Sequence, residues 1–126
     1  MQTPITLMSF GFLYGTPQDA DTVIDTRGMK NPFYEPALRD KTGLDTEVQE
    51  YVLCDETGRA FLASIVEMLR LRMELYERWD SPNKKPLLIA VGCSGGRHRS
   101  VTVALRLRQA LEEWGYTVTL IHRELS

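Results

Sequence analysis

A short apolar run that leads through glycines into a helix is the feature that most constrains the fold of this chain. Residues 86–91 read Pro-Leu-Leu-Ile-Ala-Val, without a polar side chain. Such a run is typical of a parallel strand buried on both faces. The next residues, Gly92 to Arg97, read Gly-Cys-Ser-Gly-Gly-Arg, and a helical pattern begins near His98. The order of strand, glycine loop and helix predicts an α/β fold.

The glycine loop has the composition of an anion-binding site. Glycine accepts the positive φ angles of a tight loop, and the start of a helix supplies unpaired N–H donors. Arg97, His98 and Arg99 add positive charge, while Ser94 and Ser100 add hydroxyl donors. We therefore predict that residues 93–100 hold a phosphate group.

Two catalytic interpretations compete with this binding interpretation. A Walker A loop requires a lysine that no matching position carries. Cys93 and Arg99-Ser100 do match the C-x5-R-S/T signature of cysteine-dependent phosphatases, although Gly92 stands where those enzymes usually carry histidine. In that alternative Cys93 is the nucleophile, Arg99 clamps the phosphoryl oxygens and Ser100 assists the thiolate. The general acid is then Asp25 or Asp40. We favour a binding loop without covalent chemistry.

The remaining pattern predicts a small three-layer α/β sandwich with a mostly parallel sheet. Strands are expected at 5–10, 22–27 and 116–122, and helices at 45–52, 59–79 and 98–114. Ligands bind beyond the carboxyl ends of strands in such sheets. Asp25, Arg27 and Arg123 fall at those ends and join the predicted site. Residues 28–45 lack periodicity and contain two prolines, so they predict a rim over the loop, with Arg39 and Lys41 as possible contacts.

Length and composition favour a single soluble globular domain over residues 1–126. The net charge of −2 argues against a protein that coats nucleic acid. Two cysteines in unrelated contexts, without a leader or an apolar span, predict a cytoplasmic protein with free thiols and no membrane contact. No pattern calls for a metal or a cofactor.

Several spaced motifs resemble the C-terminal domain of the RapZ family of RNase adaptor proteins. The motifs span about residues 6–125 and are Ser9-Phe10-Gly11-Phe12, Tyr14-Gly15, Pro17, Ala20-Asp21, Asp25-Thr26-Arg27, Asn31-Pro32, Leu38-Arg39, Thr42-Gly43-Leu44-Asp45, the Gly92–Val101 loop and His122-Arg123. The resemblance implies a fold similar to the ligand-binding half of phosphofructokinases. It also implies sensing of an amino-sugar phosphate such as glucosamine 6-phosphate, oligomerisation and small-RNA binding.

Carried over by motif, the implied ligand contacts match most of the predicted set. They are Asp25, Arg27, Cys93, Ser94, Gly95, Gly96, His98, Arg99 and Ser100. The chain shows neither the nucleotide-binding P-loop domain that begins full-length members nor the basic tail of those that bind small RNAs. We therefore expect no ATP or GTP hydrolysis.

The function that we predict is a regulatory module that binds a phosphorylated metabolite, either a sugar phosphate or a nucleotide. It would act through a homo-oligomer or a partner chain. The phosphatase is the alternative, and an RNA-binding adaptor that uses Arg97, His98, Arg99 and Arg123 is a third.

Overall fold

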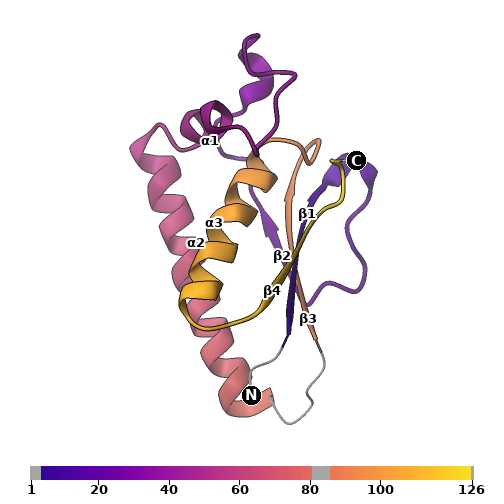
Figure 1. Ribbon diagram of the computed structural model, residues 1–126, viewed down its shortest axis with the longest axis vertical. Coiled ribbons are helices and arrows are strands. Elements are labelled where there is room, and N and C mark those ends of the chain that lie inside the picture. The colour runs from indigo at the N-terminus through magenta and orange to yellow at the C-terminus, as the bar shows by residue number, and fades with distance from the viewer. Residues whose placement is uncertain (1–3, 81–85, 126) are drawn as a thin grey trace.

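A computed structural model describes residues 4–80 and 86–125 as one parallel sheet covered by helices (Figure 1). The strands are β1 (Ile5–Gly11), β2 (Thr22–Asp25), β3 (Leu87–Cys93) and β4 (Val118–His122). The α-helices are α1 (Thr46–Val52), α2 (Glu56–Leu75) and α3 (Arg99–Glu113). Short helical turns are η1 (Phe12–Tyr14), η2 (Pro32–Tyr34) and η3 (Tyr76–Asp80), of which η3 is a π-helical turn.

The sheet has the strand order β2-β3-β1-β4 and every pair is parallel. Helices α2 and α3 lie together on one side of the sheet, and the connection from η1 to β2 returns along the other side (Figure 1). The α/β class and the parallel sheet are confirmed, with layers formed by the helices, the sheet and this connection. Because all strands run the same way, their carboxyl ends share one edge. Gly11 pairs with Cys93, and Asp25 pairs with Gly92, at that edge.

The core lies between the sheet and the two long helices. Alternate residues of β1 and β3, such as Leu7 and Ile89, are almost fully buried there. They pack with Leu69 of α2 and Leu107 of α3. The first turn of α3 is also buried, because the start of this helix packs between the sheet and residues 28–45, where Gly43 contacts it. The apolar core thereby fixes the position of the loop that precedes α3.

Element boundaries differ from the predicted ones where capping decides them. Helix α2 begins at Glu56, before the predicted Arg59, because the Asp55 side chain accepts a hydrogen bond from the Gly58 amide at 3.1 Å. Residues 55–58, predicted to separate two helices, thus cap the second one. Strand β3 continues through Cys93, two residues beyond the predicted apolar run. Within the described residues, no helix is long and apolar enough to cross a membrane.

Candidate functional site: an anion-binding cleft

The loop between β3 and α3 leaves a run of its amides free, while two of its carbonyls accept hydrogen bonds from other segments. The Ser94 carbonyl accepts from the Leu13 amide at 3.1 Å, and the Arg97 carbonyl accepts from the Gly43 amide at 2.8 Å. In the described part of the chain, the amides of residues 95–100 donate to neither a carbonyl nor a side chain. Free donors beside a helix start attract negative charge, since the helix dipole is positive there. The loop therefore presents free N–H donors and the positive end of a helix dipole, and both favour an anion.

Gly96 and Glu124 brace the back of this loop. Gly96 has a φ of 75°, and a Cβ at this position would lie 2.5 Å from the Gly11 nitrogen and 2.5 Å from Glu124 Cγ. The Glu124 carboxylate accepts from the Gly11 amide at 3.0 Å and from Arg123 Nε at 2.9 Å. The end of β1 and the segment after β4 thus hold the loop from behind.

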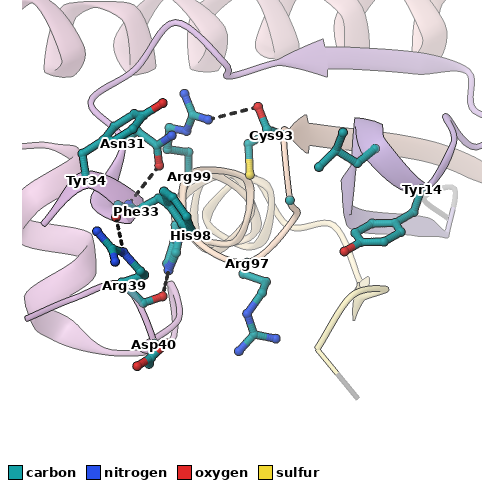
Figure 2. Close-up of a pocket in the computed structure, with 13 residues that line it drawn as sticks. Tyr14, Asn31, Phe33, Tyr34, Arg39, Asp40, Cys93, Arg97, His98 and Arg99 are labelled. Carbon is teal, nitrogen blue, oxygen red and sulfur yellow. Dashed lines mark hydrogen bonds between the residues drawn. The ribbon is translucent and has the colours of Figure 1, made fainter. Parts of the chain in front are cut away.

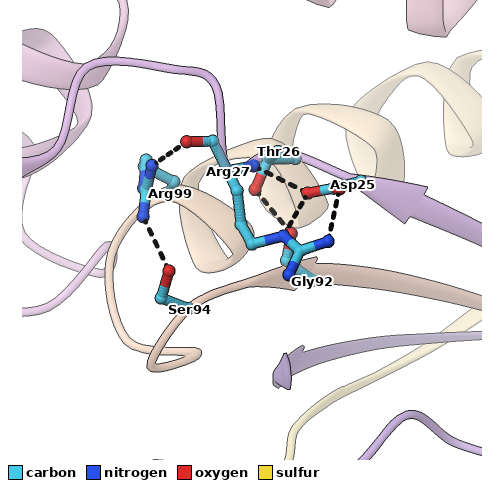
Figure 3. Close-up of polar contacts among 6 residues, drawn as sticks. All are labelled: Asp25, Thr26, Arg27, Gly92, Ser94 and Arg99. Carbon is cyan, nitrogen blue, oxygen red and sulfur yellow. Dashed lines mark hydrogen bonds and ion pairs between the residues drawn. The ribbon is translucent and has the colours of Figure 1, made fainter. Parts of the chain in front are cut away.

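Arg99 supplies a buried positive charge at the start of α3. Its side chain is 4% exposed. One terminal nitrogen donates to the Arg27 carbonyl, and the other lies 3.4 Å from Ser94 Oγ (Figure 3). The first of these nitrogens also donates to the Met29 carbonyl at 3.2 Å. Its buried Nε has no partner, and no carboxylate of the described residues forms an ion pair with it. An unpaired buried cation is unfavourable, so a bound anion would stabilise it.

Arg99 borders a cleft of about 520 Å³ at the carboxyl edge of the sheet (Figure 2). The loop side of the cleft consists of Cys93, Ser94, Gly95, Arg97, His98 and Arg99. The rest of the lining comes from two segments on either side of the loop (Figure 2), which are η1, with Leu13 and Tyr14, and the facing segment, with Asn31, Phe33, Tyr34, Arg39 and Asp40. Tyr14 and Tyr34 are 67% and 76% exposed at the margins of the cleft. The site therefore combines basic side chains of the loop with aromatic side chains from the neighbouring segments.

His98 ties the loop to the facing segment. Its Nε2 lies 3.1 Å from the Arg39 carbonyl, which can only accept, so this nitrogen donates. Arg39 in turn donates to the Phe33 carbonyl at 2.8 Å and lies over the Phe33 ring. Burial lowers the pKa of His98, and its contacts with the Lys41 and Arg39 carbonyls oppose that shift. The Lys41 ammonium itself pairs with Glu47 at the surface and does not line the cleft.

Asp25 and Arg27 form a two-point ion pair with each other (Figure 3). Their contacts measure 3.0 and 2.8 Å, and both side chains are about half exposed. The Arg27 guanidinium also lies 3.9 Å from the centre of the Phe12 ring. The hydrogen bond from Arg27 lowers the pKa of Asp25 below its ordinary value. Asp25 is therefore ionised at neutral pH, which suits a hydrogen-bond acceptor better than a general acid.

Cys93 and Ser100 meet at the floor of the cleft. Cys93 Sγ lies 3.2 Å from Ser100 Oγ, and the two residues are 3% and 0% exposed. The spacing that suggested a phosphatase thus places these groups in hydrogen-bond contact. Cys93 lines the cleft, whereas Ser100 lies behind it.

The structure brings part of the predicted site to the cleft and places the rest around it. Cys93, Ser94, Gly95, Arg97, His98 and Arg99 line the cleft. The predicted residues that do not line it are Asp25, Arg27, Gly96, Ser100 and Arg123. Arg123 pairs with Glu124 at 2.8 Å and donates to the Gly15 carbonyl at 2.6 Å, so it binds the chain itself. The prediction omitted Leu13, Asn31, Phe33 and Tyr34, although the long irregular segment 28–45 signalled where three of them would lie.

Comparison with known proteins identifies the family. The family model described as the RapZ C-terminal domain matches residues 3–126. The chain belongs to the RapZ C-terminal domain family. It is 47% identical over 124 residues to a "Nucleotide-binding protein" of Heliobacterium modesticaldum, covering 98% of this chain and 40% of that protein.

Two further relatives of this RapZ domain carry the same name. The protein of Caldicellulosiruptor bescii is 46% identical over 121 residues, which are 96% of this chain and 40% of that protein. The protein of Thermotoga petrophila is 42% identical over 123 residues, which are 98% of this chain and 43% of that protein. The chain thus spans about two fifths of the length of these relatives.

Across residues 4–80 and 86–125, no three His, Cys, Asp or Glu side chains are grouped so that they could hold an ion. The cleft offers mainly amides, guanidinium groups and aromatic rings, which recognise anions and planar or apolar groups.

The stability of this RapZ domain is expected to fall between pH 7 and pH 5. The chain has two histidines, and burial lowers the pKa of both, with Arg108 adding to the shift at His122. Below about pH 6.5 the unfolded chain takes up protons that the folded chain does not, so the free energy of unfolding decreases until pH passes the lowered folded pKa. Urea unfolding at several pH values measures this slope. His98→Gln with His122→Gln should flatten it, and a flat wild-type profile would contradict the assignment.

Proposed function

We propose that this domain binds a small phosphorylated metabolite in the cleft beside Arg99. The observation that carries the proposal is the buried Arg99 guanidinium, which has no acidic partner in the described residues and lies next to a loop with free amides. Phosphate offers the charge and the acceptor oxygens that satisfy both kinds of donor. The names of the relatives, which call them nucleotide-binding proteins, agree with a phosphorylated ligand.

The finer proposal is an amino-sugar phosphate, such as glucosamine 6-phosphate, or a nucleotide. The cleft volume of about 520 Å³ leaves room for more than a phosphate group. Aromatic side chains at its margins can pack against a sugar ring or a base. We further propose that the domain is regulatory and passes occupancy to an attached or partner chain, because the relatives are more than twice as long as this domain.

A thermal-shift screen tests the binding proposal. Inorganic phosphate, sugar phosphates and nucleotides should raise the unfolding temperature in proportion to their preference for the folded state. Glucosamine without phosphate is the matched control ligand and should have little effect. If no phosphorylated compound shifts the transition while the protein is folded, the proposal fails.

Cys93→Ser distinguishes binding from phosphatase chemistry. The substitution keeps a small hydrogen-bonding side chain beside Ser100, so a binding module should retain ligand affinity within a few-fold. A cysteine-dependent phosphatase would instead lose turnover of an aryl phosphate, since the hydroxyl is a far weaker nucleophile. Activity assays of both proteins, with calorimetry of ligand binding, measure the difference. Turnover by the wild type that vanishes in Cys93→Ser would replace our proposal with the enzyme.

The RNA-binding alternative has less support. Arg99 is buried, and Arg123 is engaged by Glu124 and by main-chain carbonyls. Of the basic residues in that alternative, Arg97 alone is an exposed charge among the described residues.

A further inference from the structure

His98 lines the cleft with a side chain whose charge changes readily near neutral pH. Its main chain is firmly held, since the His98 carbonyl accepts from the Thr102 amide at 3.0 Å and from the Thr102 hydroxyl at 2.9 Å. Gly43 packs against the same carbonyl, where a Cβ on the glycine would lie 2.7 Å from the oxygen. The imidazole ring is therefore anchored at the start of α3.

The hydrogen bond to Arg39 decides which ring nitrogen can gain a proton. Because Nε2 donates to the Arg39 carbonyl at 3.1 Å, the neutral ring carries its proton on Nε2 (Figure 2). A second proton would therefore go to Nδ1. The charged ring would donate to the carbonyl more strongly, since charge-assisted hydrogen bonds are roughly twice as strong as neutral ones. Protonation of His98 thus strengthens the link between the loop and the facing segment.

Positive charge on both sides of the ring opposes that second proton. Burial lowers the pKa of His98 most, and the neighbouring charges of Arg97 and Arg99 lower it further. In the part of the chain that the structure describes, neither guanidinium forms an ion pair with a carboxylate. An anion bound beside these arginines would compensate their charge and favour the protonated ring.

The charged groups of the neighbouring residues 39–41 do not supply that compensation. The Lys41 ammonium pairs with Glu47 at the surface, and the Arg39 guanidinium donates to a main-chain carbonyl. Asp40 lines the cleft, yet the pKa of the ring remains below its ordinary value. A ligand anion is therefore the group that can change the charge of the ring.

We propose that His98 takes up a proton when an anion binds in the cleft, and that the charged ring then holds the facing segment more tightly against the ligand. The inference rests on the function proposed above and adds a regulation by pH, because the anion and the proton each favour binding of the other. His98 acts through the Arg39 carbonyl and is thus a positioning residue. The segment that it holds carries the aromatic rings of Phe33 and Tyr34.

Proton NMR of the two histidine rings tests the proton uptake. Sulfate is the probe, because it resembles phosphate but does not titrate between about pH 5 and pH 8, where histidine does. Sulfate should raise the pKa of His98 and leave that of His122, which does not line the cleft, unchanged. His122→Gln assigns the two signals. Sulfate that stabilises the protein without shifting the His98 titration overturns this inference alone, whereas absence of any sulfate binding overturns the proposed function with it.

The pH dependence of sulfate affinity is the second measurement. Calorimetry should show several-fold tighter binding to the wild type at the acidic end of that range, in agreement with the pKa change seen by NMR. His98→Gln keeps an N–H donor for the Arg39 carbonyl but cannot titrate, so its affinity should be nearly independent of pH. His122→Gln is the matched control and should follow the wild type. An equal pH dependence in His98→Gln would refute the role of this ring.

Hydrogen exchange tests the link to the facing segment. Saturating sulfate should slow exchange of the amides of residues 31–41 in the wild type at the acidic end of the range, and should slow it less in His98→Gln. Equal slowing in the two proteins would show that the charged ring does not hold this segment.

Discussion

Arg99→Met is expected to abolish the stabilisation of this domain by phosphate and phosphorylated ligands. The variant keeps an unbranched side chain of similar length but removes the charge and its free Nε. Charge-assisted hydrogen bonds contribute about 1.5–3 kcal/mol each, so affinity should fall by roughly 10- to 100-fold or more. Thermal unfolding at increasing phosphate concentration measures the effect, since the shift of the wild type should disappear in the variant.

The ligand-free stability of Arg99→Met separates binding from folding. The substitution leaves the Arg27 and Met29 carbonyls without their donor, which destabilises the fold by about 1–3 kcal/mol. Removal of an unpaired buried charge opposes that loss. Arg106→Met, on α3 but outside the cleft, is the matched control and should respond to phosphate as the wild type does. A phosphate response retained by Arg99→Met would show that the anion binds elsewhere.

Gly96→Ala is expected to destabilise the fold by about 3 kcal/mol or more. The left-handed φ of 75° costs a residue with a Cβ about 1–2 kcal/mol. The new Cβ would also lie 2.5 Å from the Gly11 nitrogen, and main chain cannot withdraw as a flexible side chain can. Urea unfolding of the purified variant gives the free energy directly.

Gly95→Ala is the matched control for that substitution. Gly95 is the preceding residue of the same loop, its φ is not positive, and a methyl group on its Cα would meet no atom within 4 Å beyond its chain neighbours. We expect a change in stability within about 1 kcal/mol, together with weaker ligand binding because the methyl group would enter the cleft. Equal destabilisation by the two variants would contradict the bracing role of Gly96.

The sequence was sufficient to predict the parallel sheet because the pattern around residues 86–98 allows few other folds. An apolar run long enough for a buried strand and a helix directly after the glycines specify a unit of strand, loop and helix. The ends of helices and strands were harder to predict from the sequence. At Asp55, a single side-chain hydrogen bond begins α2 earlier than the apolar periodicity suggests.

The cleft could be predicted only on the side that the loop itself forms. Local spacing identifies Ser94 and Arg99, because glycines and basic residues are adjacent in the chain. The facing side depends on long-range packing that no local pattern encodes, such as the contact of His98 with the Arg39 carbonyl. A position at a strand end is also not sufficient to predict a ligand contact. Arg123 lies at such an end, yet its guanidinium donates to the Gly15 carbonyl of the chain itself.

The hydrogen bond between Glu124 and the Gly11 amide closes a loop of 113 residues. Contacts between such distant positions form late in folding, because the chain must lose much of its freedom before they can be made. During synthesis, nearly the whole domain must therefore emerge before Glu124 can bond to the end of β1. Only then do Gly11 and Glu124 together pack against Gly96 of the loop. The ligand binding that we propose for this loop would therefore require the completed domain, because folding intermediates would lack this support.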